Sequence, residues 1–430
     1  MTTTLVPITT RDELPASTSV VIIGGGIIGI TAALTLAERN VPVVLLEKGR
    51  IAGEQSSRNL GWIRKTSRHA SDIPLAVAAD TLWDNMSARV GAEVGYKRAG
   101  IMFLAKTAEQ MAQHERWLTS VDALDLDSRL LSPHAIDTLV PGGKADWQGG
   151  IYTPSDGRAE PAMATSAMAK AAIAKGAALI QGCAVRTLTT TAGRISGVVT
   201  ERGEIRCDQV LLAGGAWSRR FLGNQGVSLP TLPVIASVLR TKPMEGPTEI
   251  AVGGPDFSFR KHHAGGFIMM QRGKVDAPLT LDHLTIGMKF REQFRAGRDA
   301  LNISLDKEFL RDIKMARHWK KDEPTPFERI RVREPAINHG LLQDAMHNTA
   351  NAWPMFKHAE IEEAWAGLID VTPDSTPIID HIKTLPGLTV ATGFSGHGFG
   401  TGPAAGQLAA DIVLDEQPLV DPSPYRFDRF

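Results

Sequence analysis

A glycine triplet near the N-terminus constrains the fold of this chain more than any other feature. Gly24 and Gly26 follow the β-branched run Val20–Ile23, and Gly29 lies early in a segment, residues 27–39, with alanine and leucine at helical spacing. This pattern predicts a strand, a tight turn and a helix, followed by a second buried strand in the next apolar run. We therefore predict that the chain opens with a βαβ unit.

Each glycine of the triplet has a physical role in binding a dinucleotide. Gly24 permits the turn, Gly26 lets the backbone approach a pyrophosphate, and Gly29 lets the helix pack closely on the strand. Glu47, at the end of the second predicted strand (41–47), is expected to accept hydrogen bonds from the adenosine ribose, and an acid there disfavours a 2′-phosphate. The alternative is a glycine-rich turn in a domain that binds no nucleotide.

Two further glycine turns favour FAD over NAD. The segment 208–218 is a predicted strand that runs into Gly214 and Gly215, where a second stretch of backbone would close over an extended dinucleotide. The segment 393–400, Gly-Phe-Ser-Gly-His-Gly-Phe-Gly, precedes a predicted helix over 402–414, so its N–H groups form a nest at a positive helix end. Such a nest suits the N1 and C2=O edge of a flavin, where negative charge develops during hydride transfer. A flexible loop at the helix entry and an NAD-dependent dehydrogenase are the alternatives.

The remainder of the chain alternates helical and strand-like patterns. Helical periodicity dominates residues 80–118, and a polar loop over 151–161 leads into an alanine-rich helix over 162–175. Short strands with glycine-marked turns are then predicted at 177–181, 185–190, 193–200 and 209–213. Strand-like runs at 365–380 and 389–393 come before the final helix.

The middle of the chain predicts a second domain. Residues 232–360 mix basic and aromatic side chains, with a strand-like run at 266–271 and amphipathic helical stretches around 305–320. We predict an α/β fold with a Rossmann-like FAD-binding domain of discontinuous segments and a substrate domain with a mixed or antiparallel sheet and helices. The predicted segments are 18–95, 150–230 and 362–430 for the FAD-binding domain, and 96–149 and 231–361 for the substrate domain.

Composition excludes several other classes of function. A hydrophobic content of 43% and a formal net charge of zero give no electrostatic attraction to nucleic acid. The first strongly apolar run, residues 20–30, is too short to span a bilayer, and residues 1–17 lack the pattern of a secretory signal. Only two cysteines occur, Cys183 and Cys207, and we interpret them as buried free thiols. These features favour a cytoplasmic protein without a transmembrane segment.

No metal site is predicted. Clusters with zinc-like ligand spacing are absent from the sequence. The adjacent His262 and His263 would alternate faces if they lie on a strand, so at most one of them would point into a cleft.

Five motifs, spread from one end of the chain to the other, occur in the order found in one family of flavoproteins. They are Val-Val-Ile-Ile-Gly-Gly-Gly-Ile-Ile-Gly, Gly53-Glu-Gln-Ser-Ser-Arg-Asn59, Leu-Ala-Gly-Gly-Ala-Trp, Thr372-Pro-Asp-Ser-Thr-Pro-Ile-Ile-Asp380 and Gly-Phe-Ser-Gly-His-Gly. The chain thereby resembles the D-amino acid oxidase superfamily, in particular the branch with glycine oxidase, monomeric sarcosine oxidase, D-amino acid dehydrogenase and γ-glutamylputrescine oxidase. The resemblance covers nearly the whole chain and is specific for the family, though not for the substrate.

The resemblance implies where the cofactor contacts lie. The serine-rich loop, residues 56–59, would lie beside the pyrophosphate and the flavin, and Val185 would hold the adenine through its backbone. Residues 374–380 would border the isoalloxazine ring, with the turn around His397 at its pyrimidine end. The predicted FAD-binding residues are Gly24, Gly26, Ile27, Ile28, Gly29, Glu47, Lys48, Ser56, Ser57, Arg58, Asn59, Leu60, Val185, Ala213, Gly214, Trp217, Asp374, Gly393, Ser395, Gly396, His397, Gly398, Phe399 and Gly400.

Departures from the family pattern concern flavin attachment and the substrate anchor. Gly367 stands where sarcosine oxidases carry a flavin-linked cysteine, and the serine-rich loop lacks the histidine that other relatives use, so we expect non-covalent FAD. Gly400 stands where sarcosine oxidases place a substrate-binding lysine, and the arginine that amino acid oxidases place near Ile369 is missing. Either another cation holds the substrate carboxylate, or the substrate has none.

Three residues are the candidates for substrate and flavin chemistry. Arg64 is the candidate anchor, and an arginine that contacts the pyrophosphate or the surface is its alternative. Asp370 could recognise a cationic group of the substrate, or could be a solvated or capping aspartate. His397 is expected to modulate the charge of the reduced flavin. Lys261 and Arg272 are candidate sources of a positive charge over the ring, which would govern oxygen reactivity.

The predicted function is FAD-dependent oxidation of a C–N bond in a small amine or in an N-substituted or D-amino acid. A hydride would pass to flavin N5, and the resulting imine would hydrolyse, so no conspicuous base is required. Oxygen or a quinone-type electron carrier would accept the electrons, and a homo-oligomer would fit the sequence as well as a single chain. The alternatives are a 2-hydroxy acid dehydrogenase of the same fold, which would need a base and a carboxylate anchor, and a flavin-binding subunit of a larger oxidase complex.

Overall fold

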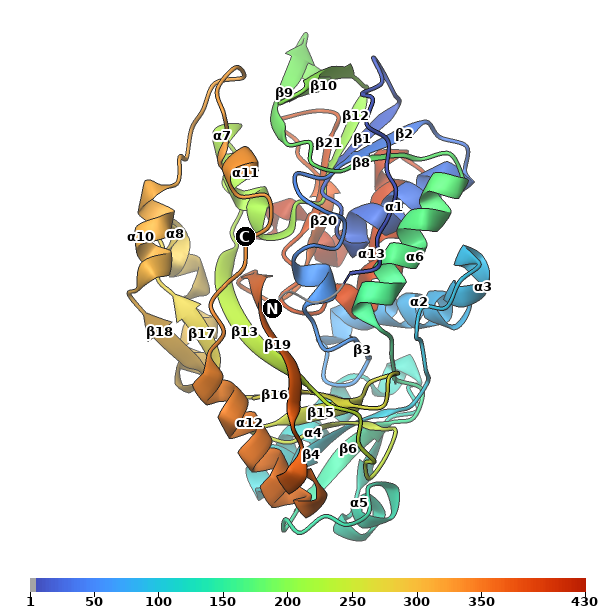
Figure 1. Cartoon of the computed structure of the whole chain (residues 1–430), viewed down its shortest axis with the longest axis vertical. Coiled ribbons are helices and arrows are strands. Elements are labelled where there is room, and N and C mark those ends of the chain that lie inside the picture. The colour runs from blue at the N-terminus through green and yellow to red at the C-terminus, as the bar shows by residue number, and fades with distance from the viewer. Residues whose placement is uncertain (1–4) are drawn as a thin grey trace.

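The computed structural model describes residues 5–430, whose strands gather mainly into two large sheets (Figure 1). The six-stranded sheet follows the order β20 (Ile378–His381), β21 (Leu388–Thr392), β12 (Gln209–Leu212), β1 (Val20–Ile23), β2 (Val43–Leu46) and β8 (Ala178–Ile180). All neighbouring strands in it run parallel except β20, which is antiparallel to β21. Its strands are short and largely apolar, as expected for parallel strands buried on both faces.

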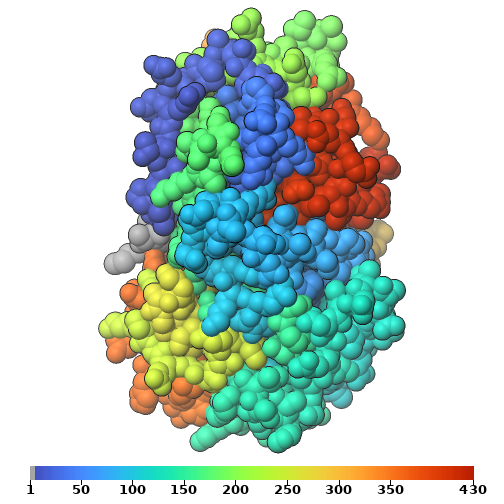
Figure 2. All heavy atoms as spheres, turned by 90° about the vertical axis from the view of Figure 1, so that its right-hand side faces the viewer, coloured from blue at the N-terminus to red at the C-terminus, as the bar shows by residue number. Residues whose placement is uncertain are grey.

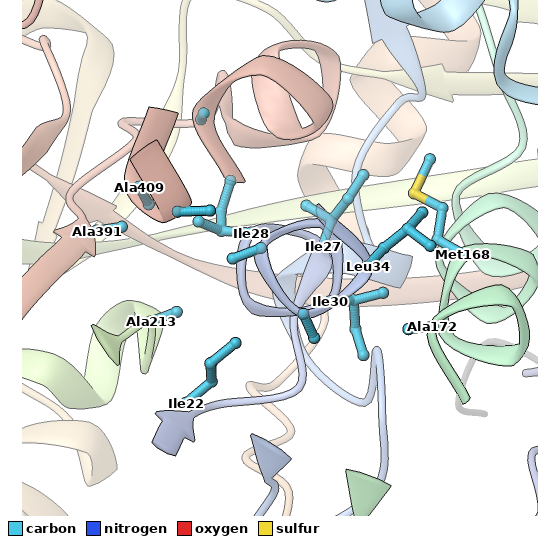
Figure 3. Packing of buried hydrophobic residues seen from close by; sticks show 14 of the residues in the cluster. Ile22, Ile27, Ile28, Ile30, Leu34, Met168, Ala172, Ala213, Ala391 and Ala409 are labelled. Atoms are coloured by element: carbon cyan, nitrogen blue, oxygen red, sulfur yellow. The ribbon is translucent and has the colours of Figure 1, made fainter. Parts of the chain in front are cut away.

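The predicted βαβ unit is present as β1, α1 (Ile27–Glu38) and β2. Helix α1 is buried on all sides, and Figure 3 shows its side chains lying between α6 (Pro161–Ala174) on one side and α13 (Gly398–Val413) on the other. The Thr31 hydroxyl donates a hydrogen bond of 2.9 Å to the Gly402 carbonyl oxygen across the α1–α13 contact. The N-terminal and C-terminal segments therefore pack side by side, as Figure 2 also shows.

A ten-stranded sheet forms the other half of the molecule, in the lower part of Figure 1. Its order is β18 (Leu301–Ser304), β17 (Val275–Pro278), β13 (Leu232–Thr241), β16 (Phe267–Met270), β15 (Ser258–Lys261), β14 (Ala251–Gly253), β4 (Ile101–Ala105), β6 (Gly149–Thr153) and β5 (Arg129–Leu131), with β19 (Ile361–Val371) paired to β13. The sheet is mixed, since β4 and β14 run parallel while most other pairs are antiparallel. Strands β6 and β19 belong to it, although most of each falls in segments expected for the FAD-binding domain.

Smaller elements complete the fold. An antiparallel sheet contains β9 (Val185–Thr191), β10 (Arg194–Thr200) and β11 (Gly203–Arg206), and β3 (Trp62–Ile63) pairs with β7 (Gly157–Arg158). The other α-helices are α2 (Ile73–Asp84), α3 (Met86–Val90), α4 (Ala108–Ser120), α5 (Pro133–Leu139), α7 (Ser218–Asn224), α8 (Asp282–Ile286), α9 (Arg291–Gly297), α10 (Lys307–Lys314), α11 (Pro326–Arg329) and α12 (His339–Ala352). None of the helices in residues 5–430 is long and apolar enough to cross a membrane.

The structure corrects three details of the secondary-structure prediction. The region 80–118 contains β4, a fully buried strand whose continuous apolar run cannot be distinguished from a helix by periodicity. The polar loop predicted at 151–161 contains the end of β6 and strand β7. Helix α13 begins at Gly398 rather than at 402, despite glycines that disfavour a helix. Gly400 is needed within the helix because of close packing: a Cβ at this position would lie 2.7 Å from the Trp62 carbonyl oxygen.

Candidate active site

One cavity extends from the glycine turn after β1 to the loop before α13. Most of the predicted FAD-binding residues line it: Gly24, Gly26, Ile27, Ile28, Glu47, Lys48, Ser56, Arg58, Asn59, Leu60, Val185, Ala213, Gly214, Trp217, Ser395, Gly396, His397, Gly398, Phe399 and Gly400. Arg64 and Asp370, the substrate candidates, also line it. The fold thus brings both distant glycine turns, near residues 24 and 396, to a single site.

Four predicted residues do not line the cavity. Gly29 serves the packing of α1, since a Cβ there would lie 2.1 Å from the Gly24 carbonyl oxygen. The Ser57 hydroxyl donates to the Glu54 carbonyl oxygen at 3.3 Å, and Gly393 has a left-handed φ of +72° in the turn after β21. The Asp374 carboxylate pairs with Arg429, 2.7 Å away, and its contact with the isoalloxazine ring stays a prediction.

The glycine-turn end of the cavity has the groups that a dinucleotide requires. Helix α1 begins at Ile27, and the first N–H groups of a helix have no partner within it, so they can bind a phosphate. The Ile27 N–H is held by the Ser56 hydroxyl oxygen at 2.8 Å. Both Glu47 oxygens accept backbone hydrogen bonds of 2.7 Å, from Gly25 and Gly49, and burial raises the pKa of this carboxyl. These features fit the nucleotide half of FAD.

Several predicted contacts are held in place by the protein itself. The Arg58 guanidinium donates to the carbonyl oxygens of Gly53, Ala366 and Arg333 at 2.9 to 3.2 Å, so it braces the wall of the cavity. Lys48 pairs with Glu54 at 2.8 Å and lies 4.4 Å from the centre of the Trp217 ring. These side chains shape the cavity rather than presenting free charge to it.

Asp370 supports the turn that precedes α13. One carboxylate oxygen accepts hydrogen bonds from the Gly393 N–H, at 2.7 Å, and from the Thr392 hydroxyl, at 3.0 Å. Its backbone carbonyl oxygen accepts a third, from the Ser395 N–H, at 3.0 Å. Burial nevertheless raises the pKa of this carboxyl. The arrangement favours a capping role over recognition of a substrate cation.

His397 and Arg64 form a pair at the N-terminus of α13. The Arg64 guanidinium donates a hydrogen bond to His397 Nε2 at 3.0 Å, and its other terminal nitrogen donates to the Thr66 carbonyl oxygen. Burial, together with the charges of Arg68 and Arg64, holds the pKa of His397 well below its usual value. The imidazole is therefore neutral, and because Nε2 accepts from Arg64, the ring proton lies on Nδ1.

Arg272, one of the two candidate sources of a positive charge, completes the site, whereas Lys261 donates to the Met244 carbonyl oxygen at 3.3 Å and does not line the cavity. Arg272 follows β16, lines the cavity and donates to the Gly254 carbonyl oxygen at 3.1 Å. Its guanidinium carbon lies 4.4 Å from the centre of the Phe103 ring, and that of Arg64 lies 5.6 Å from the same centre. Within residues 5–430, neither guanidinium forms a salt bridge with a carboxylate. Two cationic side chains from distant segments thus converge on one aromatic ring.

The two adjacent histidines differ from their predicted arrangement. Strand β15 ends at Lys261, so His262 and His263 lie in the turn after it, and their rings are 4.4 Å apart. Both face Glu160, and together the three side chains have the spacing of a potential metal site. However, the Glu160 carboxylate already accepts two hydrogen bonds from Arg260, at 2.7 and 2.9 Å. This group lies outside the cavity described above.

Comparison with solved structures gives close matches over the full chain. The structure of L-amino acid deaminase from Proteus myxofaciens has a TM-score of 0.95 and 33% identity, covering 100% of this chain and 97% of that one. L-amino acid deaminase from Proteus vulgaris has a TM-score of 0.94 and 30% identity, covering 98% and 100%.

Comparison with characterised sequences gives more distant relatives. Glycine oxidase from Geobacillus kaustophilus is 24% identical over 95% of this chain and 96% of its own length. Mitochondrial sarcosine dehydrogenase from Mus musculus is 24% identical over 99% of this chain, but the match spans only 43% of the mouse protein. A family model described as FAD dependent oxidoreductase (DAO) matches residues 19–412. This match argues against the alternative of an NAD-dependent dehydrogenase. The chain belongs to this family of FAD-dependent oxidoreductases.

Proposed function

We propose that this protein oxidises the C–N bond of an amino acid whose carboxylate is held at the cationic site that Arg64 and Arg272 form beside Phe103. This proposal is based on the observation that Arg64 and Arg272 line the cavity without a carboxylate partner among residues 5–430. A buried charge without a partner is costly, so an anionic ligand would stabilise the site. Burial and the positive charges of Arg68 and Arg272 lower the pKa of Arg64, so they destabilise its charged form. An anion bound beside Arg64 would offset this effect.

The relatives support this class of substrate. The L-amino acid deaminase of Proteus myxofaciens was solved in complex with anthranilate, which is an aromatic amine with a carboxylate. Glycine oxidase and sarcosine dehydrogenase are named for an amino acid and an N-methyl amino acid. The two arginines would take over the role of the family anchors, which are missing at Gly400 and near Ile369. A side chain at Gly400 would also clash with the Trp62 backbone.

The residues of this chain would orient the substrate and exclude water. When bound, FAD supplies a two-electron acceptor whose N5 takes a hydride from the carbon attached to nitrogen. Trp62, Phe103 and Met270 provide apolar walls on the substrate side. His397 stays neutral with its Nε2 engaged by Arg64, so it is not a free base at that atom, and the α13 N-terminus stabilises negative charge at the pyrimidine end. The imine that leaves would hydrolyse in water.

A substrate panel tests the proposed function. Anaerobic titration with amines, N-methyl amino acids, both enantiomers of amino acids and hydroxy acids should bleach the flavin absorbance only with amino acids that carry a carboxylate. Bleaching by hydroxy acids would support the 2-hydroxy acid alternative instead. Failure of every amine to reduce the flavin of the purified chain would contradict the proposal and favour a subunit of a larger complex.

Replacing His397 by alanine should slow flavin reduction by about tenfold or more, because one polar group at the pyrimidine end is lost. The ratio of wild-type to variant rate should stay constant from pH 6 to 8, since the depressed pKa keeps His397 neutral throughout this range. Stopped-flow measurement of the reduction rate checks both expectations. The exposed His358 provides the control substitution, His358→Ala. An unchanged reduction rate in His397→Ala would refute the assigned role.

We further propose that FAD is bound non-covalently and that the protein acts in the cytoplasm with oxygen or a quinone as acceptor. Gly367 offers no side chain for attachment, and the two cysteines are free and buried. Acid precipitation should therefore release the flavin into the supernatant.

A further inference from the structure

We propose that the amino acid oxidised here carries a second acidic group, so that Arg64 and Arg272 each hold one carboxylate of a small diacid. This inference rests on the proposed function, and it narrows the substrate class of the same site. Its basis is the number of uncompensated positive charges on the substrate side of the cavity, together with their common position around Phe103.

The contacts with Phe103 limit the distance between the two guanidinium groups. Their carbons lie 5.6 and 4.4 Å from the centre of the Phe103 ring, so they cannot be farther apart than the sum of these distances, about 10 Å. Trp62 packs against the same ring edge to face, with 5.5 Å between ring centres. Each guanidinium has five N–H donors, and those that do not serve Thr66, His397 or Gly254 are left to donate to a carboxylate.

Among the described residues no carboxylate forms an ion pair with either guanidinium, although the charges of Asp156 and Asp72 favour the charged form of Arg64. Arg68 lines the cavity too, but it is paired with the buried Asp72 at 2.7 Å. Asp370 lines the cavity with its carboxylate engaged by the Gly393 N–H. His397 is neutral and adds no charge. Arg64 and Arg272 are therefore the two cations left without a counter-ion among the described residues that line this end.

One carboxylate would leave the charges unbalanced. A single α-carboxylate forms two parallel hydrogen bonds with one guanidinium. The second guanidinium would then remain buried and positively charged without a partner. The charge of Arg272 already disfavours the positive form of Arg64, so the two groups repel each other in the free protein. A second carboxylate at a distance of a few carbon atoms removes this repulsion and satisfies both groups.

The test uses ligands that have no amine and cannot be oxidised. Succinate, glutarate and adipate are titrated into the FAD-loaded protein and compared with their half-amides, succinamate, glutaramate and adipamate, with binding followed by the change in flavin absorbance. At the best chain length the diacid should bind at least about tenfold more tightly than the half-amide of the same shape. Equal affinity for the two, or tighter binding of the half-amide, would overturn the inference.

Variants identify the groups responsible. Arg64→Gln and Arg272→Gln should each weaken diacid binding and remove most of the preference for the diacid over the half-amide. Arg291→Gln, at an exposed arginine of α9, is the control and should keep the wild-type preference. If one variant abolishes binding of both ligand types while the other changes neither, a single guanidinium is the anchor and the inference fails. Because these ligands carry no amine, the outcome is independent of whether amino acids reduce the flavin.

Discussion

Gly29→Ala should produce a protein that folds less stably and fails to retain FAD. The added Cβ would lie 2.1 Å from the Gly24 carbonyl oxygen and 3.2 Å from the Ile22 side chain. Because the close neighbour is backbone, helix α1 must move away from the glycine turn, at a cost of about 3 kcal/mol, the upper end of the usual range for overpacking. The shift also removes the α1 N-terminus from its position opposite the pyrophosphate. The ratio of flavin to protein absorbance and the melting temperature measure both effects.

A glycine in an open position provides the matched control. Gly223 lies in α7, and a Cβ there would meet nothing within 4 Å. Gly223→Ala should keep full FAD content and a melting temperature at or slightly above that of the wild type, because alanine favours a helix more than glycine does. A Gly29→Ala protein with wild-type flavin content would show that close helix packing is not what forms this nucleotide site.

Arg272→Met should lower kcat/KM for the best amino acid substrate by roughly 100-fold or more, as expected when one partner of a buried charged pair is removed. Methionine retains apolar contact with Phe103 but cannot bind a carboxylate. The melting temperature of the free protein should not fall, because the substitution removes a buried charge that has no carboxylate partner in residues 5–430. Loss of activity without loss of stability separates this role from a structural one.

A conservative variant sharpens the same prediction. Arg272→Lys keeps the charge but loses the planar pair of donors, so it should recover only part of the activity. Steady-state kinetics of the wild type and both variants, with a substrate from the panel, make the comparison. A kcat/KM of Arg272→Met within threefold of the wild-type value would contradict the assignment of Arg272 as an anchor.

Local patterns were enough to predict the elements that form the glycine-turn end of the cavity. The glycine turn, α1 and the acidic residue after β2 follow from short-range rules of turn geometry, helix spacing and strand composition. The motif around His397 likewise lies at a helix N-terminus, as expected. Strand β4 was missed because a continuous apolar run carries no periodicity that separates a buried strand from a helix.

The substrate half of the site depends on contacts that no local pattern encodes. Arg64 and Arg272 meet at Phe103 because the fold brings the ends of β3 and β16 close to β4, and the spacing of these residues in the chain does not predict this arrangement. The same applies to the hydrogen bond between Arg64 and His397, and to Asp374, whose partner Arg429 lies near the C-terminus.

The sequence by itself determined that the chain forms a Rossmann-like unit for FAD, because glycine conformation and helix geometry act over a few residues. Only the tertiary structure decided which charged side chains share the cavity and which are already paired. The physical reason is that a charge becomes available to a ligand only when the folded chain buries it without a counter-ion, and this depends on residues far apart in the sequence.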